Sequence, residues 1–346
     1  MRACYNSGVA QTDSVRNLEL TVAPSDAGTR LDRFVAARCK ELSRARVQEL
    51  IDAVLVQVDG RPAKASYKLR GGEVISVQPE PRPALRAEPE AIPLDVLYED
   101  EDVIAINKPA GMTVHAGAGT PRGTLVNALL GRGQSLARTG DALRPGIVHR
   151  LDKDTSGAIL IAKNDFAHAK LAEAFRKREV KKTYLALVQG KLPAEHGRIE
   201  LAISRDARRR VRMTARKHAL AGKTREARTD WRALAAIGNH TLVEIQLHTG
   251  RTHQIRVHFS AIQHPVAGDA LYGAAPQIRV GKMTLPALGR QFLHAARVVF
   301  AHPRTGKLIE VRAPLAPELR EFLEKLESAG GKSESAKIDA ALAPYI

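Results

Sequence analysis

Five apolar segments of strand-like composition constrain the fold of this chain more than any other feature. They read DVIAIN, AILIAK, TYLALVQG, TLVEIQL and QFLHAARVVF, and all lie between Leu94 and Leu326. Short runs rich in β-branched and aromatic residues favour strands. Helices are expected at residues 165–177, 253–262 and 317–326, with Asn164 and Thr252 as the caps of the first two. Because the strands do not alternate strictly with long helices, the pattern predicts an α+β fold, in which helices flank a mixed, largely antiparallel sheet.

A second, smaller unit is predicted at residues 18–78, after a disordered tail at residues 1–17. In TRLDRFVAARCKELSRARVQELI, apolar residues recur at helical spacing in two segments, and Thr29 and Asp32 have the spacing of a capping box. The stretch VLVQVDGRPAKASYKLRGGEVISV then predicts a strand, an Asp-Gly turn and a closing strand. Cations are frequent in this unit, and five of them are candidate ligands for a polyanion: Arg38, Arg44, Arg46, Lys64 and Lys68.

The remaining boundaries follow from composition. Residues 79–93 are rich in proline and poor in apolar residues, which predicts an extended linker. The larger domain is expected at residues 94–326, followed by a flexible tail at residues 327–346. There are two cysteines, and no apolar run approaches the roughly 20 residues of a membrane-spanning helix, so we expect a cytoplasmic protein that does not enter a membrane.

The net charge of +17 indicates a polyanionic partner such as RNA, although a generically basic protein would have the same total. The segment from Arg198 to Arg228 holds eleven Lys and Arg against three acids. A charge run of this kind is usually a solvated face. Here we expect a hairpin or loop that follows an RNA backbone, with Arg208, Arg209 and Arg210 among its contacts.

Two other patterns suggest a nucleotide-binding loop and a metal site, but the spacing of their residues does not fit either. HAGAGTPRG lacks the third glycine of a dinucleotide fingerprint, so a loop is expected there. Four histidines lie close together after the fourth apolar segment: His248, His253, His258 and His264. Their steps of five, five and six scatter them around a helix, which favours structural or RNA-facing roles over a metal site.

The stretch RPGIVHRLDKDTSGAILIAKND places five ionisable residues within six positions, just before an apolar strand. A buried carboxylate needs a cation or hydrogen bonds to stay ionised. For Asp152 the candidates are Arg150 and Arg256, the latter beside His253 on the predicted helix. A loop with surface ion pairs would explain the same residues. Glycoside hydrolysis is disfavoured because Asp152 and Asp154 are near neighbours in the chain and no carbohydrate-binding aromatic face is evident.

HRLDKDTSG resembles the central motif of the RluA-type pseudouridine synthases. IPLDVLYEDEDVIAINKPAGMTVHAGAGTPRGTLVNALL, KREVKKTYLALVQG and LHTGRTHQIRVHFSAIQHPVAGDALYG resemble further family segments in the family's order, over most of residues 94–273. The N-terminal unit resembles an S4 RNA-binding domain, a small α/β module. This pairing is most similar to the subgroup called ribosomal large subunit pseudouridine synthase D. Ala116 departs from the family pattern, which has proline there, and this affects the expected loop shape.

The resemblance implies a role for each matching residue. Asp152 takes the place of the catalytic aspartate, and Arg150 that of an arginine that helps fill the space of the flipped base. Tyr184 matches the tyrosine that stacks on the target base and is a candidate for proton transfer at C5. Arg256 matches the basic partner of the catalytic carboxylate. Arg251 ranks behind it and, with His253, is a candidate RNA contact.

The implied function is the isomerisation of specific uridines in 23S ribosomal RNA by a monomer. The reaction exchanges no electrons and releases no group, so no cofactor and no metal are expected. A tRNA or another RNA is the alternative target. A non-catalytic RNA-binding or ribosome-assembly factor would be served equally well by the S4-like unit and the charge, but has no use for Asp152, Tyr184 and Arg256 together.

Overall fold

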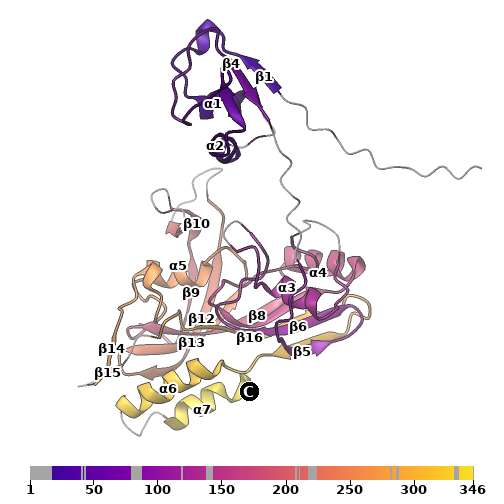
Figure 1. Ribbon diagram of the computed structural model, residues 1–346. Coiled ribbons are helices and arrows are strands. Elements are labelled where there is room, and N and C mark those ends of the chain that lie inside the picture. The colour runs from indigo at the N-terminus through magenta and orange to yellow at the C-terminus, as the bar shows by residue number, and fades with distance from the viewer. Residues whose placement is uncertain are drawn as a thin grey trace, which may run out of the picture. The chain divides into compact units, whose positions relative to one another are not determined.

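The computed structural model describes residues 18–39, 42, 44–78, 88–117, 120–137, 143–206, 209, 211–216, 224–280, 283–285, 288–330 and 335–345. The chain forms two compact units, at residues 1–85 and 86–346, whose elements are labelled in Figure 1. The division falls inside the proline-rich segment that was expected to be a linker. No helix within the described ranges is long and apolar enough to cross a membrane.

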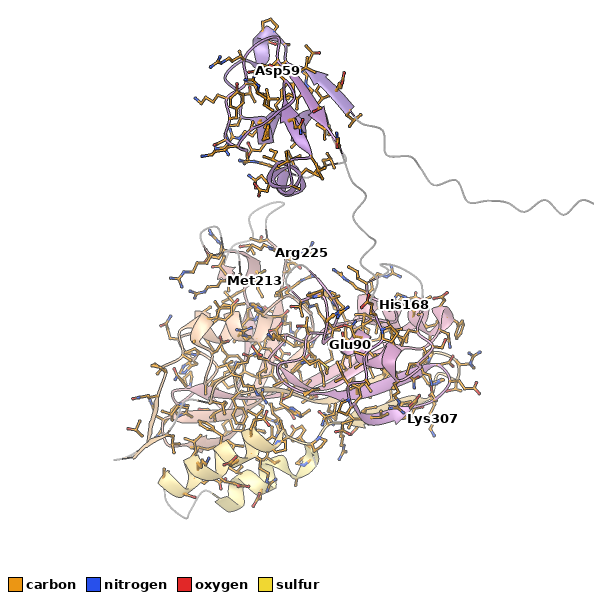
Figure 2. All side chains as sticks on the ribbon, viewed as in Figure 1. Asp59, Glu90, His168, Met213, Arg225 and Lys307 are labelled. Carbon is orange, nitrogen blue, oxygen red and sulfur yellow. The ribbon has the colours of Figure 1, made fainter. Side chains whose placement is uncertain are left out.

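The N-terminal unit combines two helices with a four-stranded antiparallel sheet in the order β1-β4-β2-β3. Its elements are β1 (Leu18–Thr21), η1 (Pro24–Asp26), α1 (Leu31–Arg38), α2 (Arg44–Asp52), β2 (Val56–Val58), β3 (Arg61–Pro62) and β4 (Val74–Val77). Asp59, labelled in Figure 2, and Gly60 both have positive φ in the predicted turn between β2 and β3. The apolar positions predicted from helical spacing, such as Leu31, Phe34 and Leu50, form the core.

The capping box predicted for Thr29 and Asp32 is wrong. The N-cap of α1 is Arg30, and it makes no side-chain capping bond. Asp32 is fully buried and accepts hydrogen bonds from Arg30, Arg44 and Gln48. The spacing of a capping box takes account of neighbouring residues alone. In the folded unit, hydrogen bonds from three side chains hold this carboxylate between α1 and α2 instead.

The larger unit is built on a nine-stranded sheet in the order β5-β6-β7-β16-β8-β13-β12-β9, with β17 also paired to β16. Its strands are β5 (Asp95–Glu99), β6 (Val103–Lys108), β7 (Ser156–Ala162), β8 (Lys181–Gln189), β9 (His196–Glu200), β12 (Arg228–Ile237), β13 (His240–Leu247), β16 (Leu293–Ala301) and β17 (Leu308–Arg312). Every pair is antiparallel except β7 with β16. The expected α+β class with a mixed, largely antiparallel sheet is therefore confirmed.

Gly157 makes the parallel contact of β7 with β16 possible. Its φ is +110°, and a Cβ added there would lie 2.3 Å from the carbonyl oxygen of Ala295. A side chain would push β7 off β16. Because β16 also pairs with β8, this close approach brings the loop before β7 near the middle of β8.

Helices flank the sheet (Figure 1). They are α3 (Leu125–Gly131), α4 (Asp165–Lys177), α5 (Gln254–Ala261), α6 (Pro317–Gly330) and α7 (Ser335–Leu342), with short turns at η2 (Ala270–Tyr272) and η3 (Ala343–Tyr345). Asn164 caps α4 as predicted, through a bond from the backbone N–H of Ala167. The predicted cap of α5 is wrong: His253, not Thr252, is the N-cap, and its φ of 54° is left-handed.

Residues 335–345 were expected to belong to a loose tail, and the structure instead gives α7 and η3 there. Ile338, Leu342 and Tyr345 are buried in the main hydrophobic cluster of the unit. The sequence does not predict this helix, because the polar stretch GGKSES precedes it and its three apolar side chains are buried only when the sheet has formed.

The predicted basic hairpin forms from β10 (Ala202–Arg205) and β11 (Met213–Arg216), which pair antiparallel. A second small hairpin joins β14 (Ile278–Val280) to β15 (Met283–Leu285). Met213, labelled in Figure 2, donates its backbone N–H to the hydroxyl of Tyr272 over 2.9 Å. The basic hairpin is thus attached to the segment that follows α5.

Candidate active site

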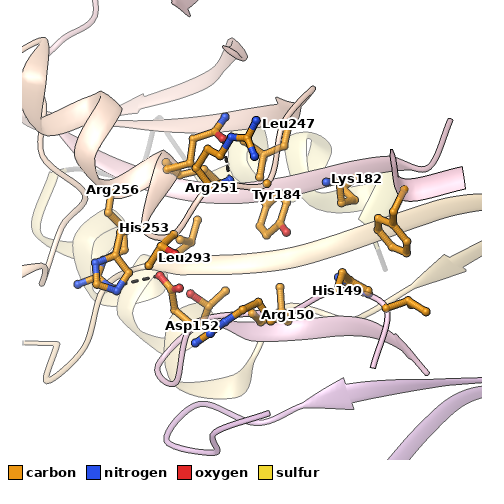
Figure 3. Close-up of a pocket in the computed structure, with 18 of the residues that line it drawn as sticks. His149, Arg150, Asp152, Lys182, Tyr184, Leu247, Arg251, His253, Arg256 and Leu293 are labelled. Atoms are coloured by element: carbon orange, nitrogen blue, oxygen red, sulfur yellow. Dashed lines mark hydrogen bonds and ion pairs between the residues drawn. The ribbon is translucent and has the colours of Figure 1, made fainter. Parts of the chain in front are cut away.

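A cavity of about 360 Å³ opens where the loop before β7, strand β8 and the start of α5 meet. Figure 3 shows the side chains around it, with Asp152 and Arg256 at one end and His149 and Lys182 at the other. All four residues expected at the catalytic centre line this cavity: Arg150, Asp152, Tyr184 and Arg256. Asp154 is not among the lining residues.

Asp152 is paired with a cation from far along the chain. Arg256 Nη1 lies 3.3 Å from Asp152 Oδ2, and the two residues are 104 positions apart. The Arg256 side chain is 9% exposed and that of Asp152 is 18% exposed. Among the described residues, no donor bonds to the other carboxylate oxygen of Asp152, which leaves it open to the cavity.

A second carboxylate, missed from the sequence, fixes the direction of the guanidinium. Asp269 is 1% exposed and binds Arg256 in a bidentate manner, at 2.6 Å to Nε and 2.9 Å to Nη2. Burial lowers the pKa of Arg256, but the bonds to Asp269 and Asp152 outweigh this and raise it above its ordinary value. The arginine therefore stays charged, and the planar fork of its donors aims it at Asp152.

Tyr272 packs beneath this arrangement. The guanidinium carbon of Arg256 lies 5.1 Å from the centre of the Tyr272 ring, and the Tyr272 hydroxyl is 3.0 Å from His253 Nδ1. Because Tyr272 also accepts the N–H of Met213, one buried hydroxyl joins the basic hairpin to the start of α5. His253, the left-handed N-cap of α5, thus contacts a residue nineteen positions further along the chain, and local sequence alone does not predict that contact.

Tyr184 lies on β8, opposite Ala295 of β16 and Ile245 of β13, and is buried. Burial, and then the negative charge of Asp152, raise the pKa of its phenol above the ordinary value. At neutral pH it is an uncharged ring beside the carboxylate. Arg150 is exposed at the mouth of the cavity.

Two buried cations support the loop that carries Asp152. Lys108 Nζ donates to the backbone carbonyls of Lys153, Pro109 and Met112 at 2.8–3.0 Å. Arg290 donates to the carbonyl of Asp154 at 3.0 Å and to the hydroxyl of Ser156 at 3.1 Å. Burial lowers the pKa of Lys108 to about 7. These bonds fix the backbone on either side of Asp152, whose carboxylate lines the cavity.

The four histidines of the candidate cluster have different partners and share none. His248 binds Asp230, His253 binds Tyr272, His258 binds Thr229 and the carbonyl of Leu201, and His264 binds the carbonyl of Gln189. Within the described ranges, no group of three or more His, Cys, Asp or Glu is arranged to hold a metal ion.

The expected RNA contacts are spread over both units. In the N-terminal unit, Lys64 and Lys68 are exposed, Arg38 pairs with Asp26, and Arg44 is tied to the buried Asp32. In the larger unit, Arg209 is exposed, whereas Arg251 and His253 line the cavity. Arg208, Arg210 and the side chain of Arg46 lie outside what the structure describes.

Comparison with known proteins decides the family. A model described as RNA pseudouridylate synthase matches residues 102–261, and one for the S4 domain matches residues 29–75. A protein of Chloroflexus aurantiacus that is named as an uncharacterized RNA pseudouridine synthase is 48% identical over 89% of this chain and 93% of its own length. The chain belongs to the RNA pseudouridine synthase family.

Other relatives carry a more specific name. The protein called ribosomal large subunit pseudouridine synthase D in Vibrio vulnificus is 40% identical over 88% of this chain and 93% of its own. Among solved structures, human RNA pseudouridylate synthase domain containing 1 is similar, with a TM-score of 0.53 and 28% identity over 69% of this chain and 89% of that one. As a pseudouridine synthase, the protein is an isomerase that acts on RNA.

Proposed function

We propose that this pseudouridine synthase isomerises specific uridines in large-subunit (23S) ribosomal RNA, with Asp152 as the catalytic residue and without a cofactor. The observation that carries the assignment is the 3.3 Å contact of Arg256 with Asp152 inside a cavity. Relatives named for the ribosomal large subunit, which match about nine-tenths of this chain, support the choice of RNA.

The isomerisation requires an ionised carboxylate and a cavity that holds one base. The N1–C1′ bond breaks, the uracil rotates, and C5 bonds to C1′; the C5 hydrogen is lost to solvent and N1 takes up a proton in its place. Asp152 begins this either by adding to the nucleotide or by removing a sugar proton, and both routes need its charge. Arg256, held by Asp269, supplies a fixed positive charge beside the carboxylate as the reaction proceeds.

The uracil must leave its stack before it can react. We assign Tyr184 as the platform for the flipped base, because it is a buried, uncharged ring in the cavity wall. We assign Arg150, which is exposed at the mouth, to the space that the base vacates. Because it is outside the strands, it can move with the RNA without disturbing the sheet.

RNA stems are recognised largely through shape and backbone, which suits two separate basic surfaces. We propose that the N-terminal unit contributes Lys64 and Lys68 and that the basic hairpin contributes Arg209, all of which are exposed. We further propose that the protein acts as a monomer, because one chain supplies every proposed catalytic group, and that it works in the cytoplasm.

Asp152→Asn tests the assignment. We expect it to abolish tritium release from C5-labelled uridine in ribosomal RNA while RNA binding stays nearly unchanged, because the amide cannot act as a carboxylate. Asp154→Asn is the matched control, since that side chain lies two positions away and does not line the cavity. Retained turnover in Asp152→Asn would reject the assignment, and equal loss in both variants would remove the distinction between the two aspartates.

The RNA target is tested separately. In a strain that lacks the protein, carbodiimide treatment followed by primer extension should show the loss of particular pseudouridines from the large-subunit RNA. Loss only from tRNA would move the target while keeping the activity.

A further inference from the structure

The end of the cavity away from Asp152 contains Lys182, a cation that has no role in the proposed reaction. Lys182 precedes Tyr184 by two residues on β8, and both side chains line the cavity. Its ammonium lies 5.7 Å from the centre of the Phe175 ring. Across from it, a Cβ added to Gly250 would lie 3.7 Å from Lys182 Nζ, so the ammonium sits against the loop before α5.

The ammonium of Lys182 pairs with no carboxylate in the described part of the chain, although its side chain is half-buried. Burial lowers its pKa to about 8, and no neighbouring acid restores it. A desolvated ammonium without a partner is costly for a folded protein. An unpaired, desolvated cation of this kind is typical of a functional site, where a bound anion balances its charge.

The neighbouring cations point the same way. Arg251 also lines the cavity, and its Nε donates to the backbone carbonyl of Glu226 over 3.2 Å. Burial lowers its pKa, and the charges of Arg225 and Arg178 lower it further. Arg176 of α4, Lys182 of β8 and Arg251 of the loop before α5 all line the cavity, whereas Asp152 is the one carboxylate among its described lining residues and lies at the other end.

We propose that Lys182 is a phosphate-binding residue, whose ammonium receives a backbone phosphate flanking the flipped uridine while the base lies against Tyr184. Residues two apart on one strand face lie about 6–7 Å from each other, so a base on Tyr184 leaves its own backbone within reach of Lys182. The inference rests on the proposed function, since it assumes that the cavity receives a nucleotide. It assigns a direction to that nucleotide, with the sugar toward Asp152 and the chain leaving past Lys182 and Arg251.

Binding of the full-length chain to a synthetic stem-loop with one looped uridine provides the test. In Lys182→Met we expect the dissociation constant to rise about tenfold or more, because a charge-assisted hydrogen bond to the phosphate is lost. The slope of log K against log salt should become shallower by about one, as for the loss of one phosphate contact. Lys182→Arg should keep most of the affinity. Lys181→Met is the matched control, because that lysine is exposed, adjacent and outside the cavity.

The partner phosphate is identified from the RNA side. Single phosphates around the uridine are replaced by neutral methylphosphonates, one per RNA. Wild type should lose affinity at one position, and Lys182→Met should show no further loss there. Additive losses at every position, or an unchanged salt slope in Lys182→Met, would overturn the proposal. Because binding needs no turnover, these outcomes judge Lys182 even if the wild type fails to release tritium, which would instead reject the proposed function.

Discussion

Replacement of Asp269 by asparagine is the perturbation that tests the site most directly. Asp269 does not line the cavity, yet it makes two of the three hydrogen bonds that Arg256 forms with carboxylates. Asparagine has nearly the same shape and removes the charge. Its amide group presents one oxygen to the guanidinium, and its NH₂ group meets another donor.

The expected magnitude follows from burial. Removal of one partner from a buried ion pair costs about 3–5 kcal/mol when the other charge is left alone. Arg256 keeps Asp152, which is 18% exposed, so we expect about 2 kcal/mol. In a domain of this size that corresponds to a fall in Tm of about 4–8 °C. If the same 2 kcal/mol is lost from the transition state, kcat falls about 30-fold.

Thermal unfolding and single-turnover tritium release measure the two effects. As a positioning residue, Asp269 should affect kcat more than KM, because the RNA contacts remain. Asp154→Asn should change neither quantity by a comparable amount. A stable Asp269→Asn enzyme with wild-type kcat would refute the argument that Asp269 aims Arg256, whereas a loss confined to KM would show that the residue serves RNA binding.

Three further outcomes are expected. Lys108→Met should lower both Tm and kcat, because three buried carbonyls lose their donor and the loop of Asp152 loses its support; an active, stable variant would contradict this. Tyr272→Phe should lower kcat while RNA binding holds, since only the hydroxyl that joins hairpin and α5 is removed. The pKa of Asp32 is lowered by Arg30 first, so its stabilisation of the N-terminal unit is present above about pH 4 and lost as pH falls below. Acid titration of unfolding should show that difference between wild type and Asp32→Asn, and a pH-independent difference would contradict it.

The parts of the fold that depend on nearby residues could be predicted from the sequence. Helix α4 and its cap Asn164 lie within one short segment, so local sequence is enough to predict them. The turn at Asp59 likewise depends on adjacent residues alone. The cap of α5 could not be predicted, because His253 takes its conformation beside Tyr272, nineteen positions later. Helix α7 was missed for a related reason, since its apolar residues are few and bury themselves only against the finished sheet.

The residues of the candidate site also differ in how far the sequence alone predicts them. Residue types and spacing alone left Arg256 as one of two partners for Asp152, and the family resemblance was needed to choose it. A partner such as Asp269 could have been predicted from the chemistry of Arg256. A buried guanidinium has five donors and seldom satisfies them with one carboxylate, so a second acid near α5 was to be expected.

The sharing of Arg256 between two carboxylates has a chemical consequence. A single arginine bound bidentately to Asp152 would occupy both oxygens and neutralise the group that must react. Here the short bidentate contacts, 2.6 and 2.9 Å, go to Asp269, and Asp152 receives one contact of 3.3 Å. The three groups together carry one net negative charge, and one oxygen of Asp152 faces the cavity. In the proposed mechanism, Arg256 therefore orients the carboxylate of Asp152 without neutralising it, and the buried Asp269 serves the reaction by fixing Arg256.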